Sequence, residues 1–547
     1  HRDLHSFPTR RSSDLLAEPP SIEKKRYFLI RDKNYVESED DSITSVDLEG
    51  IGDSWTLCPI CGVLWPYNGV KKCKCPAKDH IHHIEIKEVP SAEESLNKCF
   101  ICGLRSNEIV REFYFQRDGP AANITGTLFD QISNKPKNKR KILVFSDSRQ
   151  DAAFFASFLD TNYNRLFIRR IINDVIRRNH QEEDYRLSSL CNDIYEFQRK
   201  NDLLDRAKGS KENRKEIWGW ILKEFCALDK DYCMEGVGLA QFVPIPPKGW
   251  HGISELHESP WNLTVQEVFG LYNIILDSLR FYQIITFPEE APNPEDEIFE
   301  KFHRNRAFYV SSYNSDPKKG IYSFIPKKTS INVRSEYLRK LYFEITKQDL
   351  PREKANEVLG KIWDDLIHNW NGTGINSINK KSQILYQLDT SFWQIKPILR
   401  QEDIYICSNC GRISLINVKS VCKTFGCDGN LQPIQKSTRK GEIENNYYRR
   451  QYAYSPSSPV KVHEHTAQLT TEFGAKIQQQ FKSGELNILS CSTTFEMGVD
   501  LGDLEFIFLK NVPPEPTNYI QRAGRAGRRI DSVGYILTFA LLRSHDL

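Results

Sequence analysis

The chain has 547 residues, of which 39% are hydrophobic and 27% are charged, and its net charge is +3. These values are ordinary for a folded globular protein of about two to four domains, and they exclude a disordered chain. They also exclude a uniformly basic nucleic-acid-binding protein, so any basic binding track must be local.

The two ends of the chain do not read as natural ends. Residues 6–15 resemble the translation of a sequencing adapter, so we expect residues 1–15 to be an artefact and the protein to begin near Leu16. The chain stops at Leu547, soon after an apolar, strand-like run. We find neither a signal-peptide core nor about 18 consecutive apolar residues, which predicts a cytoplasmic protein without a membrane partner.

The first part of the chain predicts two units. Residues 16–120 are rich in cysteine, histidine and turn residues and predict a metal-binding module. Residues 142–145 then predict a buried strand, 147–149 a polar exit and 152–159 a helix. This order is typical of an α/β unit.

The middle of the chain predicts an insertion, and the end predicts a return to the α/β pattern. Residues 161–400 read as mainly helical and carry no motif with a chemical mechanism. After a cysteine cluster at 401–455, a short strand precedes residue 463, and further strands fall at 487–490, 506–509 and 534–540. Helices are expected at 471–481 and from 518. Such alternation predicts a parallel sheet covered on both faces, built from residues 121–160 and 456–547.

The cysteines are arranged for metal rather than for disulfides. Most of the 14 lie in short pairs, as expected of metal ligands in a chain without a secretion signal. The strongest cluster predicts a zinc ribbon with four thiolate ligands: Cys407, Cys410, Cys422 and Cys427. Four cysteines stand alone and are expected to be buried small hydrophobes: Cys191, Cys226, Cys233 and Cys491.

The N-terminal cluster holds more cysteines than one zinc site needs. The preferred ligand set consists of two similar knuckles: Cys58, Cys61, Cys99 and Cys102. The rival set keeps the first knuckle and adds Cys73 and Cys75. We interpret His80, His82 and His83 as surface residues. No general base accompanies either cluster, so zinc is expected to be structural.

The most informative segment reads QRAGRAGRR at residues 521–529. Its small residues let a helix start pack closely on its neighbour while the arginines project from one edge. Fixed, permanently charged guanidinium groups suit a phosphoryl-transfer site, where charge spreads over the γ-phosphate oxygens.

This segment resembles motif VI of superfamily-two helicases of the DEAD/DEAH type. Residues 492–500 (STTFEMGVD) resemble motif V, 142–149 resemble motif IV, and 463–467 resemble a histidine-bearing loop that precedes motif V. The resemblance covers about a third of the chain and implies a second RecA-like domain. The form of residues 465–468, 495–500 and 513–519 is most similar to large bacterial helicases with cysteine-rich insertions, from DISARM-type defence islands or DNA repair.

The resemblance also implies residue roles. Arg525, Arg528 and Gln521 are expected to be catalytic at the γ-phosphate, and Gly498, Asp500 and Arg522 to bind the nucleotide. Contacts to the nucleic-acid strand are expected from six residues: Ser146, Asp147, Arg149, His465, Thr493 and Thr494. Thr493 and Thr494 also fit a simple helix N-cap, and both roles can hold together.

Together these features predict the C-terminal motor half of an ATP-dependent helicase or translocase. Its partners are expected to be nucleic acid, with DNA favoured, and other subunits of a defence or repair complex. The sequence contains no Gly-x-x-x-x-Gly-Lys-Ser/Thr loop, so ATP and Mg²⁺ are assigned mainly to another domain, and the chain alone is expected to be inactive. The alternative is a non-catalytic, zinc-containing module that binds nucleic acid or protein.

Overall fold

The computed structural model describes short pieces near the N-terminus and most of residues 118–540. The described pieces are 27–30, 54–58, 63–67, 69–70 and 84–89, followed by 118–540 with gaps at 133–134, 137–138, 147, 183, 206–207, 228–230, 293–308, 314, 317–318, 329, 381–382, 456–457, 466–469, 493–500, 503 and 528–532.

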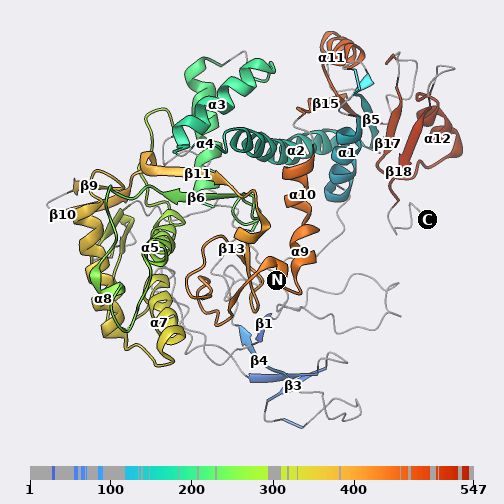
Figure 1. Cartoon of the computed structure of the whole chain (residues 1–547). Helices are drawn as coiled ribbons and strands as arrows, with labels where there is room; N and C mark the ends of the chain where they lie inside the picture. Colours follow the sequence, from blue (N-terminus) through green and yellow to red (C-terminus); the bar gives the residue numbers. More distant parts are fainter. Residues whose placement is uncertain are drawn as a thin grey trace.

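A five-stranded parallel sheet joins two distant parts of the chain (Figure 1). Its strands are β5 (Ile142–Phe145), β15 (Val462–His465), β16 (Ile488–Cys491), β17 (Phe506–Leu509) and β18 (Tyr535–Thr538). The order is β15-β16-β5-β17-β18, and every neighbouring pair is parallel. Strand β5, from the first part of the chain, therefore forms the centre of the sheet. The predicted α/β fold with a split parallel sheet is confirmed.

Both faces of this sheet are covered, because side chains of β5 alternate between two hydrophobic clusters. Ile142 and Val144 pack in the cluster that contains residues of helices α1 (Asp118–Ile132) and α2 (Arg149–Arg178). Leu143 and Phe145 pack in the cluster that contains residues of α11 (Thr471–Ser483). All residues of β5 are buried, as expected for the central strand of a parallel sheet.

Helix α2 is much longer than the helix predicted at 152–159. It begins after Ser148, whose side chain accepts a hydrogen bond from the Asp151 amide, and it continues for 30 residues. The sequence analysis placed a boundary between the sheet domain and the insertion after residue 160, but the helix continues across it, and Tyr163, Phe167 and later residues are buried. At 1.5 Å per residue, α2 spans about 45 Å. It extends from the sheet to α3 (Leu187–Lys200) and α4 (Ser210–Phe225) (Figure 1).

The insertion is largely helical, as predicted, but it also contains strands that the sequence analysis missed. Its remaining long helices are α5 (Val265–Arg280), α7 (Val333–Thr346) and α8 (Arg352–Asn369). Four strands form a sheet of order β8-β7-β10-β9, and two form the pair β11-β6. These strands are β6 (Ala240–Pro244), β7 (Tyr309–Ser311), β8 (Ile321–Ser323), β9 (Ile375–Lys380), β10 (Gln383–Leu388) and β11 (Trp393–Pro397).

The second cysteine cluster belongs to a small antiparallel sheet of order β13-β12-β14. Its strands are β12 (Tyr405–Cys407), β13 (Ile413–Ser414) and β14 (Leu431–Pro433), and two short helices follow, α9 (Lys440–Glu444) and α10 (Tyr447–Tyr454). Near the N-terminus, four antiparallel strands lie in the order β1-β4-β2-β3: β1 (Tyr27–Ile30), β2 (Ser54–Leu57), β3 (Leu64–Pro66) and β4 (Ile84–Val89). No described helix combines the length and apolar character needed to cross a membrane.

Candidate functional site

The carboxyl ends of the central strands meet at one edge of the parallel sheet. Phe145 of β5 is in register with Cys491 of β16 and with Leu509 of β17. The residues that follow these strands are Ser146, Ser492 and Lys510, and all three are buried. Ligands of open α/β sheets bind at this carboxyl edge, so it is the candidate site.

Ser146 and Asn511 place unsatisfied polar atoms at this edge. Ser146 Oγ and Asn511 Oδ1 are buried and have no hydrogen-bond partner among the described residues. A buried polar atom without a partner is costly and calls for an explanation, such as a ligand that approaches it. Arg149, also predicted to contact a strand, is exposed in the first turn of α2.

Lys510 fixes the helices around the edge. Its Nζ lies 2.5 Å from an Asp118 carboxylate oxygen and 2.8 Å from one of Asp151, in the first turns of α1 and α2. The same ammonium lies over the Phe155 ring, 4.7 Å from its centroid. Sequence reasoning missed Lys510. The sequence carried no clear signal for it, because lysine is rarely buried and the carboxylates that pair with Lys510 lie far away in the sequence.

The arginine-rich segment lies against the same edge. It begins in helix α12 (Pro516–Ala523), where Gln521 is exposed and Arg522 is fully buried. The Arg522 guanidinium lies 5.5 Å from the centroid of the Phe145 ring, at the end of β5. Burial raises the pKa of the Cys491 thiol and Arg525 opposes this shift, so Arg525 lies close to the end of β16. Arg525 is itself buried.

His465 occupies the end of β15, in register with Cys491. The predicted histidine loop is therefore wrong for His463 and His465, because both lie in the strand. The alternating apolar signal of a strand is absent here, since β15 is a half-buried edge strand. His465 Nε2 lies 3.0 Å from Gln478 Nε2, and burial lowers the pKa of His465, so the ring is neutral at pH 7.

The cysteines of the predicted ribbon form a compact cluster. The Sγ atoms of Cys407, Cys410, Cys422 and Cys427 all lie within 4.8 Å of one another. The Cys407–Cys427 and Cys410–Cys422 sulfur distances are 3.6 Å and 3.8 Å. Four thiolates about 2.3 Å from a tetrahedral zinc would stand about 3.8 Å apart, so the cluster fits such an ion.

The backbone around the four thiols has the geometry of metal knuckles. Gly411 directly follows Cys410 and Gly426 directly precedes Cys427, and both glycines have a φ of +70°. The Thr424 amide donates a hydrogen bond to Cys422 Sγ, at 3.5 Å.

The ribbon is anchored to the insertion by charged residues. From α7, Lys340 Nζ donates to the carbonyl oxygens of Thr424 and Cys427, at 2.9 Å and 3.0 Å. The Gly426 amide donates to the Glu336 carboxylate at 2.8 Å. The cysteine cluster and α7 therefore support each other.

The remaining cysteines divide into two groups. Cys58 is buried, whereas its predicted co-ligands Cys61, Cys99 and Cys102, and the alternative Cys73 and Cys75, lie outside the described residues. The four lone cysteines are buried, which confirms the prediction made for them. Burial raises the pKa of Cys191, Cys226 and Cys233 to about 12, so these thiols are unreactive at neutral pH.

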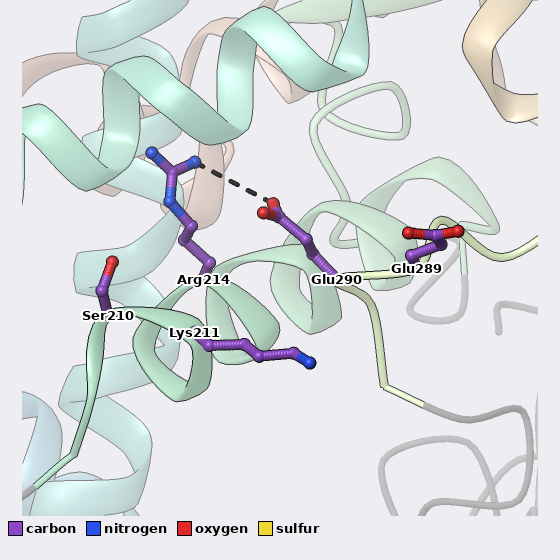
Figure 2. A pocket seen from close by; sticks show the side chains of 5 residues that line it. All are labelled: Ser210, Lys211, Arg214, Glu289 and Glu290. Atoms are coloured by element: carbon purple, nitrogen blue, oxygen red, sulfur yellow. Dashed lines mark ion pairs between the residues drawn. The ribbon is translucent and has the colours of Figure 1, made fainter.

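A surface pocket in the insertion lies apart from these sites. Figure 2 shows its side chains at the start of α4, where Arg214 faces Glu290 at 4.0 Å. Lys211 and Glu289 also line it, so positive and negative groups balance. This balance gives the pocket no preference for an anionic ligand.

Comparison with known families identifies the segment that carries the arginines. Residues 435–529 match the model described as "Helicase conserved C-terminal domain". They are the C-terminal region of a superfamily-two helicase. This helicase region contains β15, β16, β17 and α12, and β5 completes its sheet from the first part of the chain.

The chain is also similar to several known helicases and to a Druantia protein. Druantia protein DruE of Escherichia coli (strain UMEA 4076-1) is 42% identical over 101 residues, which cover 16% of this chain and 6% of that protein. The ATP-dependent helicase Lhr-Core of Methanocaldococcus jannaschii is 33% identical over 81 residues, covering 14% of this chain and 10% of the relative. Lhr-Core of Sulfolobus acidocaldarius is 32% identical over 69 residues, which cover 13% of this chain and 8% of that protein. The matches thus span only a small part of each relative.

Several expected residues of the helicase region lie outside the described residues: Asp147, Thr493, Thr494, Gly498, Asp500 and Arg528. The described ones converge on the carboxyl edge. Ser146, His465, Arg522 and Arg525 lie at or beside the ends of β5, β15 and β16. Gln521 is exposed on α12.

Proposed function

We propose that this chain is the C-terminal motor half of an ATP-dependent DNA helicase or translocase. The observation that carries the proposal is the meeting of the arginine-rich segment with the ends of β5 and β16, inside the helicase match. In this proposal the chain forms one wall of an ATP site whose phosphate-binding loop and Mg²⁺ belong to a second RecA-like domain. The chain's arginines and strand-contact residues act from this wall.

The proposed ATP-facing residues act by charge. Arg525, Arg528 and Gln521 meet the γ-phosphate, and the two guanidinium groups neutralise the charge that spreads over its oxygens in the transition state. Gly498, Asp500 and Arg522 lie on the nucleotide side and couple it to these arginines. The burial of Arg522 against the Phe145 ring supports a positioning role for this residue, because it links α12 to the strand that leads to Ser146.

The proposed strand track runs along the same edge. Ser146, Asp147, Arg149, Thr493, Thr494 and His465 contact the nucleic-acid backbone, which positions a strand without reading its sequence. The unsatisfied Ser146 Oγ supports this assignment, because its hydroxyl can donate a hydrogen bond to a phosphate oxygen without breaking one within the protein. Alternating closure and release of the two motor domains then moves the strand.

The proposed metal is zinc, in two structural sites. The first is the cluster of Cys407, Cys410, Cys422 and Cys427, which holds the ribbon of residues 401–455. The second uses Cys58, Cys61, Cys99 and Cys102, with Cys73 and Cys75 as alternative ligands, in a module of residues 16–120. The motor domain comprises residues 121–160 and 456–547, with the insertion at 161–400. We also propose that the chain acts together with other subunits of a defence or repair complex.

The first test is binding of single strands by the purified chain. We expect labelled single-stranded DNA to bind more tightly than RNA of the same sequence, without base preference. The logarithm of the affinity should fall with the logarithm of the salt concentration by about 0.7 per phosphate contacted. Fluorescence anisotropy at a series of salt concentrations measures both the affinities for the two strands and their dependence on salt. An unaltered chain that binds neither strand at low salt would refute the proposed function.

A further inference from the structure

Helix α10 has two faces with different roles. Its sequence, YYRRQYAY, places Tyr448 and Tyr452 four residues apart on one face. Tyr452 is only 1% exposed, and its hydroxyl donates to the Tyr232 carbonyl oxygen and accepts from Arg169. The Tyr448 ring packs on that of Tyr232, with centroids 4.5 Å apart. This inward face anchors α10 to α2 and to the insertion.

The outward face carries a stripe of two tyrosines and an arginine. Tyr447, Arg450 and Tyr454 occupy positions i, i+3 and i+7, which share one side of a helix. All three are exposed, and the exposed fractions of Tyr447 and Tyr454 are 40% and 78%. Seven residues of helix separate the two tyrosines by about 10 Å along the axis. We call Tyr447, Arg450 and Tyr454 the outward stripe.

The fold uses the outward stripe only in part. The Tyr447 hydroxyl donates one hydrogen bond to Asn123 at 3.3 Å, and its ring contacts only the edge of Tyr448 among the described aromatic residues. Large aromatic side chains left on a helix surface bring little packing energy, and they are typical of binding surfaces.

The charge around the outward stripe favours an anionic partner. Helix α10 contains two arginines and no acidic residue. Arg450 is exposed, whereas Arg449 is half-buried and donates to the carbonyl oxygens of Val237 and Gly238. The acidic residues nearby are paired: Glu444 with Lys440 at 3.5 Å, and Asp130, which lies near Tyr447, with Arg170 at 2.8 Å.

A narrow crevice between α1, α2 and α10 opens beside Tyr447 and adds polar groups. Asn123, Asn162 and Gln451 line it with side-chain amides, and Arg170 forms part of its wall. The crevice is too small for a phosphate or a base, so these amides only make the surface beside Tyr447 polar. The outward stripe itself combines two rings for stacking with one exposed positive charge.

We propose that the outward stripe of α10 is a second binding site for the single strand, where two bases stack on Tyr447 and Tyr454 and a phosphate contacts Arg450. This inference rests on the proposed function, since it extends the path of the same strand. Base stacking on aromatic rings tolerates any sequence, as a translocating motor requires. Helix α10 contacts α2, whose first turn lies at the carboxyl edge of the sheet, and Figure 1 shows this connection. In this proposal the single strand runs from the carboxyl edge of the parallel sheet along α2 to α10 and the insertion.

The test compares two double variants of the whole chain. Tyr447→Leu with Tyr454→Leu removes the rings, and Tyr447→Phe with Tyr454→Phe keeps them. Stacking on one aromatic ring is worth about 1–3 kcal/mol per base by alanine substitution, so loss of both rings should weaken the binding of single-stranded DNA at least about 30-fold. The phenylalanine pair should remain within about twofold of the unaltered chain. Arg450→Ala should lower the salt slope by about 0.7.

Tyr313→Leu is the matched control, because Tyr313 is a 63% exposed tyrosine elsewhere in the insertion, and it should leave binding unchanged. The thermal melting curve of each variant serves as the folding control. We expect it to match that of the unaltered chain. Full affinity of the leucine pair, or an equal loss in the phenylalanine pair, would overturn the stacking site and leave the proposed function standing. A parent chain that binds no single strand would overturn both.

Discussion

Replacing Arg528 by alanine should lower kcat for strand-stimulated ATP hydrolysis by about 10³-fold or more, in a protein that carries this chain together with its ATP-binding domain. Arginine fingers typically contribute about 10³ to 10⁵ in rate, because they neutralise charge that develops only in the transition state. Arg525→Ala should have an effect of similar size. Steady-state phosphate release at saturating ATP and single-stranded DNA measures kcat directly.

The adjacent Arg529 provides the matched control for this experiment. It has the same charge and no proposed contact with ATP, so Arg529→Ala should stay within about threefold of the unaltered protein. Single-strand affinity in the absence of ATP should be unchanged in the Arg528 variant. Equal rates in the Arg528 and unaltered proteins, or an equal loss in the Arg529 control, would contradict the assignment of Arg528.

Removing two sulfur ligands, by Cys407→Ser with Cys427→Ser, should cost the chain one zinc ion and unfold the ribbon. Structural zinc contributes about 10–16 kcal/mol of binding energy in small zinc modules, far more than the ribbon's few buried apolar residues can replace. Metal analysis of pure protein counts the zinc. Limited proteolysis between residues 400 and 440 reports the unfolding.

The structure also predicts how far this damage spreads. Lys340 and Glu336 of α7 are bonded to the 424–427 loop, and Lys423 forms an ion pair of 3.1 Å with the buried Asp277 of α5. Loss of the metal should therefore loosen α5 and α7 as well. Cys191→Ala, which removes a buried thiol outside the cluster, should leave the zinc content unchanged. Less than one zinc per unaltered chain would contradict the metal assignment.

The motor sheet could be predicted from the sequence because its signals are local. The apolar runs at 142–145 and 506–509 coincide with β5 and β17, and the helix predicted at 471–481 matches α11 closely. The four ribbon cysteines were found for the same reason, since close pairs with glycine turns mark a metal site without knowledge of the fold. Motif order then related these pieces to a helicase.

The features that were missed depend on distant contacts. Helix α2 continues past Leu159 because its polar residues Arg169 and Arg170 pair with Glu224 and Asp130, partners far along the chain. The strands of the insertion are short, and β6 finds its partner β11 about 150 residues later. The inward and outward faces of α10 are likewise indistinguishable in a sequence with tyrosine on both. Only the packing of Tyr452 separates them.

The most direct test follows phosphate release by the isolated chain while single-stranded DNA is titrated into it. We expect the chain to bind the strand with salt-dependent affinity and to hydrolyse ATP no faster than buffer does, because its sequence contains no Gly-x-x-x-x-Gly-Lys-Ser/Thr loop. ATP hydrolysis by the isolated chain that is stimulated by the strand would contradict the proposal that a second domain supplies the phosphate-binding loop.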